Sequence, residues 1–447
     1  MESQYDLTEG NIWKRLIFFF FPILAGSLLQ QLYTTADAVI IGRFAGKDAL
    51  ASIDAIYNLT KLPVNFFIGL STGATIIISQ YLGAKDNEKL TMAVHTAVAF
   101  AFTGGLLLSI AGILLSPVCL YLLRVPGDIY NYTLSYARIY FAGMAVSMTY
   151  NIGAGILRAV GNSKTPFYFL IAASTVNVVL DLVFVGVFRW HAAGAAFATV
   201  LSQLLSAVLV MGTLLSTRLP CRIRWRDIRF RSPVLQKIFL LGLPVGIQSS
   251  LYPVANMMIQ SRINAFGTNV IAAWAVCGKL DFLIWLTVDS LGAALSTFVA
   301  QNFGARLYAR AGKGVRVCIG MSLVCVCAIS AVLYFGCGPL GRLFVNDDEV
   351  ISLISFLMRF LAPLYFIYIG GEVLSGAIRG TGETFMPMIL TLLGTCACRI
   401  IWILFVVPFQ PALKMVIWSY PVSWIVTSLS FIVFYQFRKS SVLQPAR

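Results

Sequence analysis

The chain has 447 residues, of which 59% are hydrophobic and only 11% are charged, and its mean hydropathy is +0.83. A soluble domain carries about 25% charged residues, so this composition excludes an ordinary soluble protein and indicates a membrane protein. The net charge of +15 would also suit a nucleic-acid-binding protein. We expect no nucleic-acid partner, because the basic residues are spread along one face of the membrane.

Twelve apolar stretches follow one another along the chain, each reaching the roughly 20 residues that a helix needs to cross a bilayer. Because backbone groups in lipid must be hydrogen-bonded within the segment, each stretch predicts a helix. The sequence therefore predicts an all-α integral membrane protein with twelve transmembrane helices. We expect the first stretch to stay in the mature protein, since it is too long for a signal-peptide core. The stretches lie near residues 15–41, 49–80, 91–123, 134–157, 165–188, 192–216, 234–261, 270–302, 315–345, 350–377, 385–408 and 412–436.

Sequence signatures of the first half return 221 positions later in the second half. A duplication of the whole chain explains this single offset. It predicts an N-lobe (1–217) and a C-lobe (238–447), each with six helices, joined by a basic cytoplasmic linker (218–237). We expect the lobes to be related by a pseudo-two-fold axis along the membrane normal, as in duplicated transporters. The signatures are Gln80, Gly83, Ala84, Lys85, Arg138, Gly155, Arg158, Gly161 and Pro166, repeated as Gln301, Gly304, Ala305, Arg306, Arg359, Gly376, Arg379, Gly382 and Pro387.

Lysine and arginine set the predicted orientation. If the N-terminus is cytoplasmic, the inside segments hold 21 cations, among them Arg447 at the chain end, and the outside loops hold seven. This bias follows the positive-inside rule, so we expect a multi-pass plasma (inner) membrane protein with both termini in the cytoplasm.

Ionisable side chains inside the predicted spans are the candidate functional residues, because each costs roughly 2.5 to 3.5 kcal/mol near the bilayer centre. Asp37 follows Pro22 by fifteen residues, and Asp181 follows Pro166 by fifteen. At 1.5 Å per residue both carboxyls lie about 22 Å beyond their prolines. Asn177 precedes Asp181 by one turn on the same helix face. This set predicts a site for a proton or a sodium ion, although each side chain could simply cap a helix or pair with a neighbour.

Further ionisable residues lie in the spans and carry both charges. Lys61 is a candidate partner for Asp37 or Asp181. The second half has no matching acidic pair, and its charges could form either a network that links the halves or a static ion network. These candidates are Lys279, Asp281, Asp289, Glu372 and Arg399.

Proline and aromatic residues indicate movement and an apolar cavity. Pro22 and Pro244 occur near the same place in the first and seventh spans, where each permits a bend, so both are hinge candidates. The 32 Phe, 18 Tyr and 8 Trp suffice to line an adaptable cavity for aromatic cations. The nine cysteines and two histidines give no metal or disulfide pattern, and we expect neither a cofactor nor enzymatic activity.

Several motifs in order resemble the MATE (multidrug and toxic-compound extrusion) transporters, and the resemblance covers nearly all the chain. They are Leu32-Tyr33-Thr34-Thr35-Ala36-Asp37, Gln80-Tyr81-Leu82-Gly83-Ala84, Leu157-Arg158-Ala159-Val160-Gly161-Asn162-Ser163, Asn177 with Asp181, Gly278-Lys279-Leu280-Asp281, and Gln301-Asn302-Phe303-Gly304-Ala305.

This resemblance implies two six-helix lobes across a central cleft, which export organic cations in exchange for H+ or Na+ by alternating access. It also implies that Asp37, Asn177 and Asp181 match the N-lobe cation site of the DinF-type branch. Some members carry a carboxylate in the seventh span where this chain has Tyr252, so a C-lobe sodium site of that kind is not expected.

We therefore expect a monomeric antiporter whose partners are small organic cations and the lipid bilayer. One alternative is a flippase for a lipid-linked oligosaccharide, in which Lys61, Lys279, Arg359 and Arg399 would face an anionic cargo. Another is a membrane enzyme or sensor, which would need clustered catalytic groups or an added signalling domain.

Overall fold

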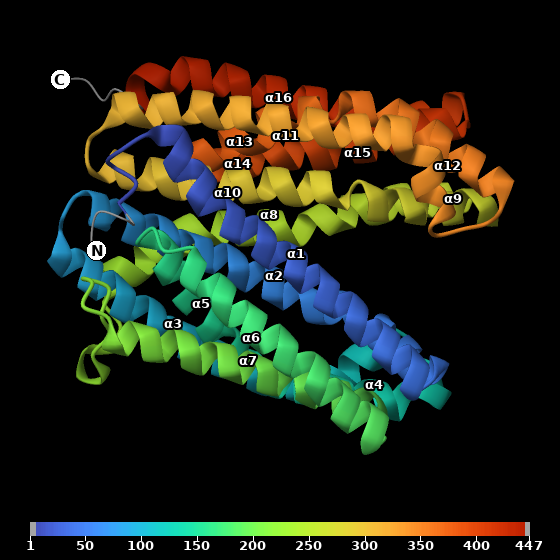
Figure 1. Ribbon diagram of the computed structural model, residues 1–447, viewed down its shortest axis with the longest axis horizontal. Coiled ribbons are helices and arrows are strands. Elements are labelled where there is room, and N and C mark those ends of the chain that lie inside the picture. Colours follow the sequence, from blue (N-terminus) through green and yellow to red (C-terminus); the bar gives the residue numbers. More distant parts are fainter. Residues whose placement is uncertain (1–5, 443–447) are drawn as a thin grey trace. The chain divides into compact units, whose positions relative to one another are not determined.

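The computed structural model describes residues 6–442, and these residues form helices and turns without a strand (Figure 1). Ten helices are long and apolar enough to cross a membrane, and the pair α12–α13, bent by 50°, makes an eleventh candidate. The predicted all-α class is confirmed. The ends of the chain, including Arg447, lie outside the described residues. The main helices are α1 (Ile12–Phe44), α2 (Lys47–Gly83), α3 (Asn87–Leu122), α4 (Gly127–Ala142), α5 (Met144–Ala159), α6 (Lys164–Asp181), α7 (His191–Ser216), α8 (Ser232–Asn264), α9 (Thr268–Leu280), α10 (Phe282–Gly304), α11 (Tyr308–Arg342), α12 (Asp348–Leu361), α13 (Phe366–Gly380), α14 (Phe385–Thr391), α15 (Cys398–Ile401) and α16 (Leu413–Val442).

Every predicted span is occupied by helix, but several spans are broken. The span near 134–157 is divided at Gly143 into α4 and α5, and the span near 270–302 is divided at Asp281 into α9 and α10. The spans near 165–188 and 385–408 contain π-helical segments: η2 (Leu182–Val187), η5 (Leu392–Ala397) and η6 (Trp402–Val406). Hydropathy alone does not reveal such breaks, because both parts of a broken span are equally apolar.

The duplication is visible in backbone conformations that are rare for most residues. After α2 the chain turns at Lys85 with a φ of 56°, and after α10 it turns at Arg306 with a φ of 60°. Each turn is closed by a 3.0 Å hydrogen bond, from the Lys85 nitrogen to the Leu82 oxygen and from the Arg306 nitrogen to the Phe303 oxygen. Glycines with positive φ recur at the same offset, at 46 and 267 and again at 161 and 382. The same turns are therefore built twice.

Helix packing repeats as well. In the first half α5 packs on α2, α3 and α7, and in the second half α13 packs on α10, α11 and α16, which are the repeat counterparts. A Cβ atom on Gly155 would meet the hydroxyls of Ser71 and Thr75 on α2. Its counterpart Gly376 lies against the backbone of Gly292 on α10, 221 positions after Ser71. Small residues thus allow close approach at the same place in both halves.

Two compact units make up the described chain. The first unit contains Asp6 and Phe21–Gly246, and the second contains Leu7–Phe20 and residues 247–442. These units differ from the predicted lobes, 1–217 and 238–447, in where the beginnings of α1 and α8 belong. The lobes remain our prediction of which two stretches of the sequence arose by duplication.

Hydrogen bonds explain why the chain start belongs to the second unit. The Leu7 nitrogen donates to Gln301 Oε1 over 3.1 Å, and Asn302 Nδ2 donates to the Leu7 oxygen over 3.2 Å. Arg310 Nη2 donates to the Glu9 oxygen over 2.9 Å. The Leu7 side chain is 3% exposed. The repeated residue Gln301 therefore anchors the segment that leads into α1.

The basic linker is attached to α3. The Arg224 nitrogen donates to His95 Nε2 over 2.9 Å, and His95 Nδ1 lies 2.7 Å from the Thr91 oxygen. Cys221 and Ile223 are buried, and burial raises the pKa of the Cys221 thiol to about 12. The linker is thus a packed part of the first unit.

Glycines bring α2 and the first part of α8 into close contact within the first unit. A Cβ atom on Gly69 would overlap the backbone of Gly246, and one on Gly73 would overlap the backbone of Gly242. The four glycines form a small-xxx-small pair of the kind that lets helix backbones touch.

We predict that Gly73→Leu lowers the thermal unfolding temperature of the purified protein, because an inserted side chain forces the helices apart at about 1–3 kcal/mol. The matched control is Gly212→Leu, since a Cβ atom there meets nothing within 4 Å. Equal melting curves for the two variants would contradict the close packing.

Candidate functional site

Two helices of the first unit supply an acidic site. Asp37 lies in α1, and Asn177 and Asp181 lie in the last two turns of α6. The chain passes directly from Asp181 into the π-helical segment η2, and such segments are frequent at functional sites. Asn177 and Asp181 are each 1% exposed, whereas Asp37 is half-buried. The structure therefore brings together the three residues that the sequence singled out.

Polar atoms at this site lack partners. Within residues 6–442, no hydrogen bond reaches Asp37 Oδ1, either Asp181 carboxylate oxygen, or either polar atom of the Asn177 side chain. Ser174 Oγ is also buried without a partner, one turn before Asn177 on the same face of α6. Buried polar groups are nearly always hydrogen-bonded, so such a cluster is suited to bind an ion or another polar ligand. Sequence reasoning overlooked Ser174, although its spacing of three and seven residues from Asn177 and Asp181 was a usable signal.

The carboxyl groups of Asp37 and Asp181 are close enough to influence each other's ionisation. Two ionised carboxylates have no donor to share, so a hydrogen bond between them requires a proton on one of them. A metal cation could replace that proton, because carboxylate, amide and hydroxyl oxygens suit hard cations. Tyr136 of α4 lies near enough to both acids for their charges to act on its hydroxyl group. The arrangement can therefore hold one positive charge.

Asp37 connects the acidic pair to a cavity of about 220 Å³ within the first unit. Lys61 lines the same cavity, but its Nζ lies 5.4 Å from the centre of the Tyr57 ring and makes no ion pair with any described residue. The predicted pairing of Lys61 with Asp37 or Asp181 is thus absent from this structure. Other polar lining residues are Gln30, Tyr33, Thr34, Asp54, Tyr57, Thr60, Tyr136, Tyr140, Ser147, Tyr150, Asn151, Thr199 and Gln203.

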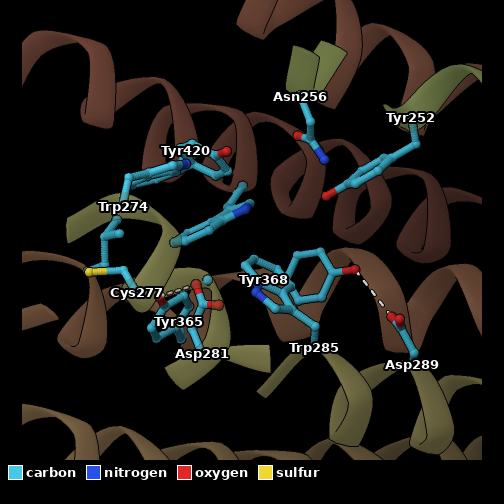
Figure 2. Close-up of a pocket in the computed structure, with 13 residues that line it drawn as sticks. Tyr252, Asn256, Trp274, Cys277, Asp281, Trp285, Asp289, Tyr365, Tyr368 and Tyr420 are labelled. Atoms are coloured by element: carbon cyan, nitrogen blue, oxygen red, sulfur yellow. Dashed lines mark hydrogen bonds between the residues drawn. The ribbon is translucent and has the colours of Figure 1, made fainter. Parts of the chain in front are cut away.

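A second cavity, of about 290 Å³, lies within the second unit (Figure 2). Asp281 and Asp289 line it, and each accepts a hydrogen bond from a tyrosine of the α13 region. The Tyr365 hydroxyl donates to Asp281 Oδ2 over 2.8 Å, and the Tyr368 hydroxyl donates to Asp289 Oδ1 over 3.4 Å. Most of the other lining residues are aromatic, and Asn256, Cys277, Gly278 and Leu361 complete the wall. The aromatic residues are Tyr252, Trp274, Trp285, Tyr365, Tyr368, Tyr420 and Trp424.

Arg399 stands beside this second cavity and is fully buried. Its Nε donates to Ser423 Oγ over 3.0 Å, and its Nη1 donates to Asn256 Oδ1 over 2.8 Å. Its guanidinium carbon lies 4.4 Å from the ring centre of Tyr420 and 5.5 Å from that of Tyr252. Tyr252 stands at the position where the family resemblance implies a carboxylate in some members. In this chain its ring lies against the Arg399 guanidinium.

The remaining candidates lie apart from this cavity wall. Glu372 forms an ion pair with Arg379, with 2.7 Å between Oε1 and Nη2. Lys279 is exposed, and its Nζ lies 5.5 Å from the ring centre of Phe344. Asp281, two residues later, turns toward Tyr365 instead. The second half therefore gathers Asp281, Asp289 and Arg399 around one cavity. The sequence did not predict this, because the cavity walls come from α8, α9, α10, α12, α13 and α16.

We predict that Asn177→Leu leaves the unfolding temperature of the ligand-free protein unchanged or raised, because it removes two buried polar atoms that lack partners. The same variant should lose the stabilisation that Na+ or a lower pH gives the wild type, since a ligand stabilises only the state that binds it. Melting curves with and without Na+ at several pH values measure both effects. Asn264→Leu, at an exposed position of α8, is the control, and a full ligand response in Asn177→Leu would contradict the site.

Several known proteins are similar to this chain in sequence or in fold. A family profile described as MatE matches residues 22–183 and 244–404. The probable multidrug resistance protein YoeA of Bacillus subtilis (strain 168) is 27% identical over 440 residues, covering 96% of this chain and 95% of that protein. A FAD transporter of Shewanella oneidensis is 25% identical over 371 residues, covering 82% and 81%. A solved structure described as the outward-facing conformation of a multidrug resistance MATE family transporter of the MOP superfamily has a TM-score of 0.90, covers 98% of both chains and is 21% identical.

The profile matches once in each half, and the two matches begin at Pro22 and Pro244. The first match contains Asp37, Asn177 and Asp181. The resemblance seen in the sequence is confirmed at the level of the family, and the predicted duplication agrees with the double match. The chain is a multi-pass membrane transporter that belongs to the MatE family.

Proposed function

We propose that this protein is a secondary antiporter that exports drug-like organic cations across the plasma membrane in exchange for protons or sodium ions. The observation that carries the proposal is the set of unpartnered buried polar atoms of Asp37, Asn177 and Asp181. The multidrug role given for YoeA supports small organic cargo, and the relatives do not favour a flippase. The relative described as a FAD transporter makes the range of cargo a question for experiment.

Coupling follows from the charge of the acidic pair. With no cation bound, Asp37 and Asp181 place two negative charges next to each other, which is unfavourable at short range. A proton or Na+ between them removes that repulsion, and a bound Na+ would in addition have the oxygens of Ser174 and Asn177 as candidate ligands. The ion shifts the conformational equilibrium by its differential affinity for the two states, and cargo that prefers the other state is thereby exchanged.

The prolines are the proposed hinges. In α1 the division between the two compact units falls between Phe20 and Phe21, next to Pro22. In α8 it falls between Gly246 and Ile247, two residues after Pro244. Both helices are continuous through these prolines. A proline removes one backbone hydrogen bond and eases bending there, so the position of the division supports hinges at Pro22 and Pro244.

We further propose that one chain is the working unit, with both termini in the cytoplasm. Each candidate cavity is lined by residues of a single compact unit of one chain, so no second copy is needed to complete a site. The excess of cations in the predicted inside segments supports the orientation.

We predict that Asp37→Asn abolishes gradient-driven efflux and leaves expression and the unfolding temperature nearly unchanged, because asparagine keeps the shape but cannot exchange a proton. Efflux of a fluorescent organic cation from energised cells is the measurement. Asp48→Asn, which removes an exposed carboxylate from the first turn of α2, is the control. Normal efflux by well-folded Asp37→Asn would refute the coupling role.

Transport measurements on the purified protein in proteoliposomes identify the coupling ion. We predict that a pH gradient alone or a sodium gradient alone drives uptake of a fluorescent cation, and that Asp181→Asn removes the response to the effective gradient. The reason is that Asp181 shares the bound charge with Asp37. Uptake that persists in Asp181→Asn at the wild-type rate would place the coupling site elsewhere.

A further inference from the structure

We infer that the basic linker is a docking site for anionic phospholipids, in which residues 224–230 bind lipid phosphate groups with their arginines and place two aromatic rings in the membrane interface. We call residues 224–230 the basic-aromatic strip. The inference goes beyond export, because it gives the protein a lipid partner in addition to its cargo, and it does not depend on how transport is coupled.

Hydrogen bonds fix the backbone of the linker around the basic-aromatic strip. The Ile223 nitrogen donates to the Leu214 oxygen in the last turns of α7 over 2.9 Å. The next nitrogen, that of Arg224, donates to His95 of α3 over 2.9 Å, and a hydroxyl of α3 donates to the Arg229 oxygen over 3.5 Å. The side chains of the strip therefore leave a held backbone. A preorganised surface loses less entropy on binding than a flexible tail does.

This backbone turns apolar side chains inward and charged side chains outward. Cys221 and Ile223 are 0% and 1% exposed, whereas Arg222 and Arg224, which alternate with them, are exposed. Arg222 is partly occupied, since its Nε donates over 3.1 Å to a backbone oxygen near the end of α7. Arg224 begins the part of the linker whose side chains are free to meet a partner.

The arginines of the basic-aromatic strip have no acidic partner. Arg224, Arg226 and Arg229 are exposed, and none of them forms an ion pair with an acid among residues 6–442. Asp227 is the single acid in the strip. Arginine binds phosphate through two parallel charge-assisted hydrogen bonds, so these side chains suit the phosphate groups of lipids.

Two exposed aromatic rings lie among these cations. Trp225 is 68% exposed and Phe230 is 48% exposed. Aromatic rings collect at the boundary between lipid headgroups and acyl chains, and basic residues combined with exposed aromatics are typical of segments that lie on a membrane surface. A lipid surface therefore gives both the charges and the rings of the strip a partner.

The flanking helices place the strip near the headgroup level. Val208 of α7 is 58% exposed and lies eight residues before that helix ends at Ser216. Leu240 of α8 is 72% exposed and lies eight residues after that helix begins at Ser232. Eight helical residues rise about 12 Å, so exposed apolar surface suited to acyl chains begins about 12 Å from each end of the linker. A linker packed this close to the hydrocarbon lies at the membrane surface.

The sequence repeat indicates that packing alone does not require these cations. Ile228 corresponds to Leu7 at the offset of 221, and both are apolar residues before the first long helix of their half. The next three residues differ in character: Arg229, Phe230 and Arg231 correspond to Thr8, Glu9 and Gly10. The segment before α1 thus packs with acidic and neutral side chains, and the charges and ring of the strip are additional to that need.

Lipid nanodiscs that hold the whole protein test the assignment. The discs combine phosphatidylcholine with an increasing fraction of phosphatidylglycerol, and the unfolding temperature is measured at each fraction. We expect the wild type to become more stable until a plateau is reached, because a ligand that binds only the folded state stabilises it. The gain should shrink in about 1 M salt, where the Debye length is about 3 Å. Both faces of a disc carry the same lipids, so the result does not depend on orientation.

The decisive variant combines Arg226→Gln with Arg229→Gln, which removes two exposed charges and keeps the backbone bonds of the linker. It should weaken phosphatidylglycerol binding about fivefold for each arginine removed. The matched control combines Lys313→Gln with Arg316→Gln, which removes two exposed charges from α11. The control should respond to phosphatidylglycerol like the wild type.

Fluorescence quenching is a second measurement that does not depend on stability. Phosphatidylglycerol with brominated acyl chains quenches nearby tryptophans, and the difference between the wild type and Trp225→Phe isolates Trp225 from the other seven tryptophans. We expect brominated phosphatidylglycerol to quench Trp225 more strongly than brominated phosphatidylcholine at the same fraction. The double arginine variant should lose this preference.

The inference is overturned if phosphatidylglycerol neither stabilises the wild type nor quenches Trp225 preferentially. It is equally overturned if the double arginine variant matches the wild type in both measurements, or if the α11 control loses as much as that variant. Stabilisation by RNA or inorganic phosphate in discs of pure phosphatidylcholine, to the extent seen with phosphatidylglycerol, would assign the strip to a soluble anion and reject the lipid.

Discussion

Asp37 of α1 and Asp181 of α6 place two carboxyl groups close enough to influence each other's ionisation. No hydrogen-bond partner among the described residues reaches Asp37 Oδ1 or either carboxylate oxygen of Asp181. This pair connects α1 to the end of α6, where the helix passes into a π-helical segment. The surrounding hydroxyl and amide groups are equally unsatisfied. The packing of the first unit therefore holds an incomplete polar site in place, and a mobile cation is the simplest group that completes it.

The scaffold is symmetric but its chemistry is not. Turns with left-handed residues and close helix contacts recur at an offset of 221, so both halves position their helices alike. The positions equivalent to Asp37, Asn177 and Asp181 are Met258, Cys398 and Trp402, so the acidic site is not repeated. The second unit instead gathers aromatic rings, two carboxylates and a buried arginine. A duplicated frame with two different cavities can bind an ion and a cargo at separate places.

Depth along a helix was enough to associate Asp37 with Asp181, because both follow a proline by fifteen residues and both helices were assigned the same direction. The same reasoning failed for Lys61, since depth says nothing about which way a long side chain turns, and here it turns to Tyr57. Lys279 and Asp281 are two residues apart and have different neighbours, Phe344 and Tyr365. The cavity around Asp289 was not foreseen because its walls come from six helices, and one sequence contains no information on which faces of distant helices meet.

The sequence by itself determined that the chain lies in a lipid bilayer, how many apolar spans it has and that its two halves are repeats. It also determined where along the helices the acidic residues lie. All of these can be read from hydropathy and residue spacing, which are properties of short stretches of the chain. Only the tertiary structure decided that Ser174 joins the acidic site, that Asp281 and Asp289 share a cavity, and that Arg399 is buried among tyrosines with Asn256 and Ser423 as partners. These contacts depend on helix rotation and on breaks such as those at Gly143 and Asp281. A rotation changes which side chains meet without changing the apolar pattern, and so it becomes visible only once the helices are packed.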